Sequence, residues 1–195
     1  MFAPDLKGFG DNADMPYPYS LNDYLNDVKE YMYKNSIHRP HVIAHSFGAR
    51  IALLGASTDQ QLFGKLVLTG AAGLKSKFSI TKQLKKCVFK TLKPILGKQK
   101  LKRFYSSDYL ALPPLMQQSF VKVINQTLDG NLQFILNPTL LIFGENDNQT
   151  PLYMAKRLNR GIKNSKLIIY KNAGHFAFVD CPIKFNLEVK EFLLP

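Results

Sequence analysis

The sequence contains little cysteine and no long hydrophobic run. Cys87 and Cys181 lack the spacing of a metal site or of a disulfide framework, and we interpret both as reduced thiols. No stretch of about 18 apolar residues occurs, and no charged segment followed by an apolar one precedes Ala3. The sequence therefore predicts neither a membrane span nor a secretory signal, and it favours a cytoplasmic location.

Negative charge is also scarce, and it is absent from one segment altogether. The 195 residues include 26 Lys and Arg but 14 Asp and Glu, which gives a formal net charge of +12. The segment 75–103 contains no Asp or Glu, and its 11 basic residues nearly equal the whole excess. These residues are Lys75, Lys77, Lys82, Lys85, Lys86, Lys90, Lys93, Lys98, Lys100, Lys102 and Arg103. Because the remainder is close to neutral, the charge belongs to one segment and does not mark the whole protein as a binder of polyanions.

The length of 195 residues and the 46 % content of hydrophobic residues are sufficient for one sizeable globular domain. Within it, the stretch His41–Arg50 combines a short apolar run, a serine between small residues and a helix-like run. This pattern predicts a strand, a tight turn at Ser46 and a helix. A serine at such a turn adopts an unusual backbone conformation that holds its hydroxyl clear of the sheet. Ala44 stands where the usual G-x-S-x-G pattern has its first glycine, which is a departure of one methyl group.

A nucleophilic serine requires a base to take its proton and an acid to orient that base. Candidates for both follow downstream. Residues 140–151 predict a buried strand that runs into a polar turn containing Asp147. Residues 167–175 predict another strand, followed by a loop that ends on glycine and His175.

The order of these motifs resembles that of the α/β-hydrolase superfamily, whose members carry serine, then an acid, then histidine. The resemblance extends from the stretch 3–10, APDLKGFG, to the terminal helix. It implies that Ser46 is the nucleophile, Asp147 the orienting acid and His175 the base. It also implies that the backbone N–H of Phe47 donates to the oxyanion.

Other polar residues compete for these roles. Family position favours Asp147 over Glu145 as the acid, and we expect His45 to be a structural residue of the turn because His175 occupies the motif of the base. A further group of acids, Asp5, Asp11 and Asp14, is interpreted as turn residues rather than as a metal site. No metal or cofactor is expected.

The resemblance implies an α/β-hydrolase fold: a mostly parallel sheet with flanking helices and an inserted helical cap. The predicted core comprises residues 1–73 and 137–195, and the predicted cap comprises residues 74–136. Strands are expected to end near residue 6 and to lie at 41–45, 65–70, 137–144 and 166–170, with helices at 21–34, 49–56 and 182–194. Ser20 is the predicted N-cap of the first of these helices.

In the family, the D-x-x-G-x-G stretch seen at residues 5–10 follows the fourth strand. The resemblance therefore implies that the first three strands, with the loop that supplies the second oxyanion donor, are absent from this chain. The third strand would lie between the fourth and the strand that carries Ser46, so a gap is expected there. We favour a fragment or a mistaken start codon over a natural truncated relative, because the triad is complete. The activity described here is that of the complete domain, and little or none is expected of the 195-residue chain alone.

Within the predicted cap, apolar residues recur on one helical face while lysines occupy the other, up to a break near Pro94. The apolar positions are Ile80, Leu84, Val88, Leu92 and Ile95. We favour a cap whose apolar face covers the substrate cleft; the alternative is a cap that attracts anionic lipid surfaces or anionic substrates. Nucleic acid is not expected, because the aromatic residues fit the apolar stripe. The following Ser106, Ser107 and Asp108 predict a helix-capping turn.

These features together predict a serine hydrolase that cleaves an ester or thioester of a medium-sized, partly hydrophobic acyl substrate. The same triad also serves amide and carbon-carbon bond hydrolysis and peroxidase chemistry, and the residues do not separate these. A non-catalytic binding or regulatory protein is the alternative from another class. A basic adaptor for membranes or nucleic acids would leave the ordered triad unexplained. The oligomeric state is not predicted.

Overall fold

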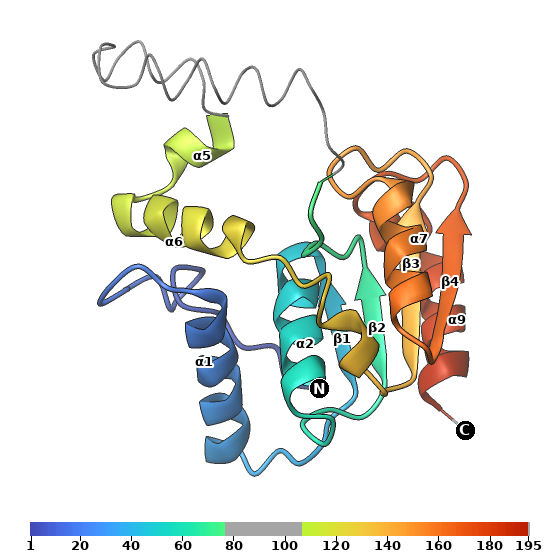
Figure 1. The fold of residues 1–195 in the computed structure, drawn as a ribbon, viewed down its shortest axis with the longest axis horizontal. Helices are drawn as coiled ribbons and strands as arrows, with labels where there is room; N and C mark the ends of the chain where they lie inside the picture. Colours follow the sequence, from blue (N-terminus) through green and yellow to red (C-terminus); the bar gives the residue numbers. More distant parts are fainter. Residues whose placement is uncertain (77–106, 195) are drawn as a thin grey trace.

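The computed structural model describes residues 1–76 and 107–194 (Figure 1). At its centre is a parallel sheet in the order β1-β2-β3-β4. The strands are β1 (Val42–His45), β2 (Leu66–Thr69), β3 (Thr139–Gly144) and β4 (Ser165–Tyr170). Every residue of β2 and β3 is buried, as expected for inner strands covered on both faces. The predicted α/β architecture is confirmed.

Helices cover both faces of this sheet. Leu66 and Leu68 of β2 belong to a core shared with helices on one face, whereas Val67 between them belongs to a second core on the other. The first face is covered by α1 (Leu21–Lys34), α2 (Ser46–Thr58) and α7 (Leu152–Gly161), and the second by α8 (Ala177–Asp180) and α9 (Pro182–Leu193). The period of two along the strand thus sets the two layers.

Helix α1 begins where the sequence predicts. The hydroxyl of Ser20 accepts the backbone N–H of Asp23 at 3.3 Å, and the carboxylate of Asp23 accepts the backbone N–H of Ser20 at 2.7 Å. This reciprocal capping box satisfies two N–H groups that the helix cannot satisfy itself. The buried residues Leu21, Tyr24 and Leu25 then hold the helix on the core.

The expectation that residues 1–6 end a strand is wrong. These residues form no strand, and the only nearby pairing in the described chain is an isolated bridge between Phe9 and Asn12. A strand needs a hydrogen-bonded neighbour, and the sheet ends at β1, where Ile43 is 51 % exposed. Asp5 instead accepts the backbone N–H of Asp11 at 3.0 Å, which makes it a turn residue.

Between β2 and β3, the chain leaves the alternation of strands and helices. The described part of this insertion contains α5 (Ser107–Ala111), α6 (Pro114–Asn125) and the short 3-10 helix η2 (Leu132–Phe134). Figure 1 shows α5 and α6 beyond the carboxyl ends of the strands. The predicted cationic helix, Cys87 and Ser106 lie outside the described residues. The division into core and cap stays a prediction.

Candidate active site

Ser46 lies at the junction of β1 and α2, in a strained backbone conformation. Its φ is +47°, in the left-handed region, which costs an L-residue about 1–2 kcal/mol. A Cβ on Gly48 would lie 3.8 Å from the Cβ of Ala44, an ordinary van der Waals distance, so the methyl group of Ala44 fits beside position 48. Within the described residues, the hydroxyl of Ser46 makes no hydrogen bond. The predicted strained turn is present, with a free hydroxyl.

Asp147 follows β3 and is buried among hydrogen-bond donors. Its Oδ1 accepts the backbone N–H groups of Gln149 and Thr150, each at 2.8 Å, and its Oδ2 accepts the Thr150 hydroxyl at 2.6 Å. Burial acts to raise the pKa of Asp147, but the hydrogen bonds from Thr150 and His175 outweigh it and lower the pKa below its ordinary value. The carboxylate is therefore ionised. Sequence reasoning missed Thr150, although a hydroxyl three residues after an acid is a local signal for such a turn.

His175 is oriented by this carboxylate. Its Nδ1 lies 2.8 Å from Oδ2 of Asp147, and its side chain is 7 % exposed. Because an ionised carboxylate only accepts hydrogen bonds, Nδ1 carries a proton. In the neutral ring, Nε2 is then the nitrogen with the lone pair. Gly70, at the end of β2, has a φ of +49°, and a Cβ there would lie 3.0 Å from the imidazole. A glycine at this position leaves space for the ring.

His45 contacts His175 directly. The ring centroids are 4.6 Å apart, and Phe176 and Phe178 enclose His45 at 5.0 and 5.1 Å. Its Nδ1 lies 2.9 Å from the hydroxyl and 3.1 Å from the carbonyl oxygen of Thr69. Burial, and then the neighbouring His175, lower the pKa of His45, so this ring stays neutral. The structural role expected of His45 thus includes packing on the predicted base.

The three predicted residues follow strands of one parallel sheet at the same edge. Ser46 follows β1, Asp147 follows β3 and His175 follows β4. Because the carboxyl ends of parallel strands meet at one edge, residues far apart in sequence come together there. A hydrogen bond joins Asp147 to His175, and the ring of His45, the residue directly before Ser46, contacts the ring of His175.

Comparison with known proteins identifies the family of this chain. The model of the alpha/beta hydrolase family matches residues 1–186. The chain belongs to the α/β-hydrolase family. This α/β-hydrolase is 27 % identical over 223 residues to the AB hydrolase superfamily protein YisY of Bacillus subtilis, across 96 % of the chain and 79 % of YisY.

A further relative and a solved structure are also hydrolases by name. The chain is 30 % identical over 181 residues to a 2-hydroxy-6-oxononadienedioate/2-hydroxy-6-oxononatrienedioate hydrolase of Paraburkholderia xenovorans, across 80 % of the chain and 63 % of that protein. The solved structure of the meta-cleavage product hydrolase CumD from Pseudomonas fluorescens superposes with a TM-score of 0.72 at 22 % identity, across 97 % of the chain and 78 % of CumD. At that identity, the likeness to CumD shows the fold.

Glu145, the second candidate for the acid of this α/β-hydrolase, points elsewhere. It is exposed, and its carboxylate accepts the backbone N–H of Asn172 at 3.3 Å. The backbone path after β3 therefore brings Asp147, and not Glu145, to His175. This is the arrangement that family position favoured.

Phe47 places its backbone N–H in the first turn of α2. The first N–H groups of a helix have no acceptor within it, and the helix dipole favours negative charge there. The ring of Phe47 packs edge-on against Tyr24 at 4.9 Å and lies tilted against Phe9 at 6.0 Å. These contacts hold the partly buried side chain against the core, while the N–H lies at the turn that contains Ser46.

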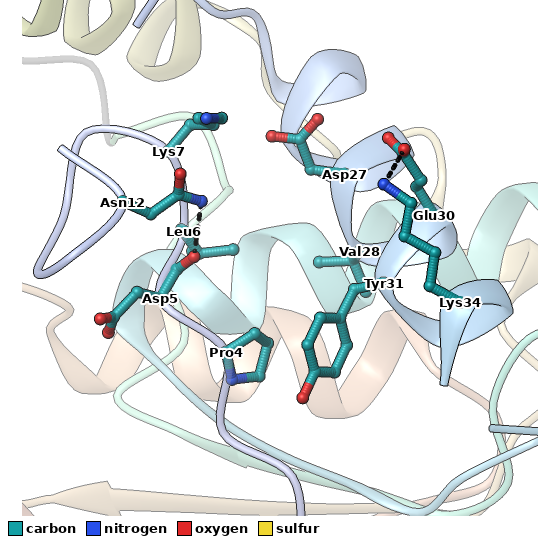
Figure 2. Close-up of a pocket in the computed structure, with 10 residues that line it drawn as sticks. All are labelled: Pro4, Asp5, Leu6, Lys7, Asn12, Asp27, Val28, Glu30, Tyr31 and Lys34. Atoms are coloured by element: carbon teal, nitrogen blue, oxygen red, sulfur yellow. Dashed lines mark hydrogen bonds and ion pairs between the residues drawn. The ribbon is translucent and has the colours of Figure 1, made fainter. Parts of the chain in front are cut away.

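A separate pocket of about 270 Å³ lies between the loop at residues 4–12 and α1. In Figure 2, Lys7 and Asp27 lie on opposite sides of it, and Glu30 pairs with Lys34 at its rim. The lining of this pocket contains neither serine nor histidine, so we do not assign the hydrolase active site to it.

In residues 1–76 and 107–194, no cluster of His, Cys, Asp and Glu has the arrangement of a metal site. No helix of this part combines the length and apolarity needed to cross a bilayer.

Proposed function

We propose that this α/β-hydrolase is a serine hydrolase in which Ser46 attacks a carbonyl carbon, His175 is the base and Asp147 orients and stabilises His175. The observation that carries the proposal is the 2.8 Å hydrogen bond between the buried carboxylate of Asp147 and Nδ1 of His175. The positive φ of Ser46 and its free hydroxyl support it.

In this mechanism, Nε2 of His175 takes the proton of the Ser46 hydroxyl as its oxygen bonds to the substrate carbonyl carbon. Asp147 stabilises the imidazolium that results. The N–H of Phe47, at the positive end of α2, donates to the oxyanion. His175 then gives its proton to the leaving group, and an acyl-Ser46 intermediate remains. Water attacks this intermediate after losing a proton to His175, which returns it to Ser46.

The proposed substrate is an ester or thioester with a medium-sized, partly apolar acyl group, used in the cytoplasm. Helix α6 supports an apolar cap, since Met116 and Val123 are buried while Phe120 and Ile124 are about half exposed. These residues are spaced i, i+4, i+7 and i+8, so they form one apolar face of a helix beyond the catalytic edge, and part of that face is exposed. A small acyl substrate fits such surroundings better than a nucleic acid does.

A second candidate function is the hydrolysis of carbon-carbon bonds. It is favoured by the relatives from Paraburkholderia and Pseudomonas that are named hydrolases of 2-hydroxy-6-oxo dienoates. The same triad can serve both reactions. Parallel assays distinguish the two reactions. Ester hydrolysis releases p-nitrophenol from p-nitrophenyl esters of increasing chain length, whereas carbon-carbon cleavage removes the absorbance of a 2-hydroxy-6-oxo dienoate.

Fluorophosphonate labelling tests the proposal, because the probe reacts with an activated serine and needs no known substrate. The experiment labels the 195-residue chain and a version translated from further upstream in its gene, each beside its own Ser46→Ala control. Mass spectrometry identifies the modified peptide. Labelling confined to Ser46 in either version is the expected result. If neither version is labelled, the proposal is wrong and a non-catalytic binding protein becomes the better account.

A further inference from the structure

Arg50 is a buried arginine one helical turn after Ser46. Its exposed fraction is 8 %, and burial lowers its pKa. Residues four apart lie on the same face of a helix, so Arg50 follows Ser46 along one side of α2. No carboxylate pairs with it in the described chain. A buried cation without a counter-ion is costly, and its hydrogen bonds must compensate for that cost.

Those hydrogen bonds go to the end of α6. Nη1 of Arg50 donates to the carbonyl oxygen of Val123 and, at 3.2 Å, to that of Gln126. Gln126 is the C-cap of α6. The last carbonyl groups of a helix have no N–H donor within the helix, and they carry the negative end of its dipole. Arg50 therefore caps α6 across more than 70 residues of sequence.

The path from Arg50 to Ser46 is short. A Cβ on Gly73 would lie 3.5 Å from Cγ of Arg50, so the arginine packs against the loop after β2. In the same loop, Ala72 donates its N–H to the carbonyl oxygen of Ser46 at 3.3 Å. The carboxyl end of α6, the loop after β2 and the turn at Ser46 thus form one contact network.

The middle of α6 is held independently. The Ser119 hydroxyl accepts the backbone N–H of Tyr19 at 2.8 Å and donates to the carbonyl of Leu115, also at 2.8 Å. Because Ser119 is buried at this point, α6 has one fixed point there. The contact of Arg50 fixes its carboxyl end, and two fixed points define the direction of a helix axis.

We propose that Arg50 is a positioning residue that holds the carboxyl end of α6 against the turn at Ser46 and so selects which acyl groups reach that serine. The selection of acyl groups rests on the proposed function, whereas the holding of α6 does not. Both hydrogen bonds come from one nitrogen, Nη1, so a single amino group of the guanidinium joins two carbonyl groups at the end of α6.

Hydrogen exchange tests the holding of α6. Arg50→Met removes the charge and both hydrogen bonds. Arg50→Lys keeps the charge on a flexible side chain, and this variant should disturb folding less than Arg50→Met does. Arg157→Met is the matched control, because Arg157 also donates to a backbone carbonyl, that of Lys75, but not to α6. We expect amide exchange in residues 114–126 to rise at least about tenfold in Arg50→Met, less in Arg50→Lys, and not in the control. A rise of equal size in α7 and α9 would show a general loss of stability and overturn the proposal.

Labelling rates with a short and a long alkyl fluorophosphonate test the selection. We expect the ratio of the two rates to change at least about fivefold in Arg50→Met, to be partly restored in Arg50→Lys and to stay constant in Arg157→Met. An unchanged ratio in Arg50→Met, with faster exchange in α6, would overturn the selective role. A wild-type protein that neither probe labels would overturn the proposed function and the selective role together, while the exchange experiment would still decide whether Arg50 holds α6.

Discussion

Replacing Ser46 by glycine is expected to stabilise the protein while it abolishes reactivity. Ser46 has a φ of +47°, which costs a residue with a Cβ about 1–2 kcal/mol. Glycine removes this cost but gives the unfolded chain more freedom, which offsets about 0.4–1 kcal/mol. Alanine keeps the Cβ and the strain. We therefore expect Ser46→Gly to be more stable than Ser46→Ala by up to about 1.6 kcal/mol, which corresponds to a rise of up to about 6 °C in melting temperature.

Ser36 provides a matched control for this measurement. It is exposed, it follows α1 and it has a φ of +51°. The pair Ser36→Gly and Ser36→Ala should show the same difference in the free energy of unfolding, measured by urea denaturation and by thermal unfolding. Labelling by a fluorophosphonate should survive in both Ser36 variants and disappear in both Ser46 variants. If Ser46→Gly is no more stable than Ser46→Ala while the Ser36 pair shows the gain, the turn at Ser46 does not store the strain inferred here.

Three further changes test the surroundings of the site. Asp147→Asn should slow labelling by about 10²–10⁴-fold. Because the folded protein lowers the pKa of Asp147, the ionised carboxyl stabilises the fold above about pH 4, and this stabilisation is lost as the pH falls through the lowered pKa. Urea unfolding from pH 7 downward should therefore depend less on pH in Asp147→Asn than in the wild type. His45→Ala should slow labelling far less than His175→Ala, and equal losses would overturn the assignment of His175 as the base. Burial raises the pKa of Asp27, so ionisation of this carboxyl destabilises the fold as the pH rises past the ordinary pKa of an aspartate. In thermal unfolding, Asp27→Asn should be more stable than the wild type at pH 7, and the difference should vanish near pH 3.

The sequence predicts the elements whose signals are local. The capping box at Ser20, the apolar run of β3 and the small residues around Ser46 each depend on neighbours within a few positions, and each is found where it was expected. The strand expected at residues 1–6 fails for the converse reason, because a strand depends on a partner that composition does not specify.

Contacts that join distant segments were out of reach of the sequence. The ring contact between His45 and His175, and the hydrogen bonds of Arg50 to the end of α6, connect residues that only the order of the sheet brings together. The choice of Asp147 over Glu145 came from the family resemblance, since both are acids at the end of one strand. Burial and hydrogen bonding separate them physically, and neither is visible in the residue types.

The pairing of acid and base also depends on a residue without a side chain. A Cβ on Gly144, the last residue of β3, would lie 2.1 Å from the carbonyl oxygen of Gly174 and 2.4 Å from that of Ala173. Both are backbone atoms of the loop after β4, and the N–H of Asn146 donates to the carbonyl of Ala173 at 2.9 Å. The loops after β3 and β4 therefore touch directly at Gly144.

Gly144→Ala should consequently separate Asp147 from His175. Because the obstructing atoms are backbone, the new methyl group must displace one loop, and a displacement of about 1 Å at a catalytic contact costs about 10²-fold in rate. We expect labelling at Ser46 to fall by about this factor in a protein that still folds. Gly130→Ala is the control, since a Cβ there meets no atom within 4 Å, and it should leave the rate unchanged. Normal labelling in Gly144→Ala would mean that reactivity at Ser46 does not depend on the bond between Asp147 and His175, and the proposed roles of both residues would fall with it.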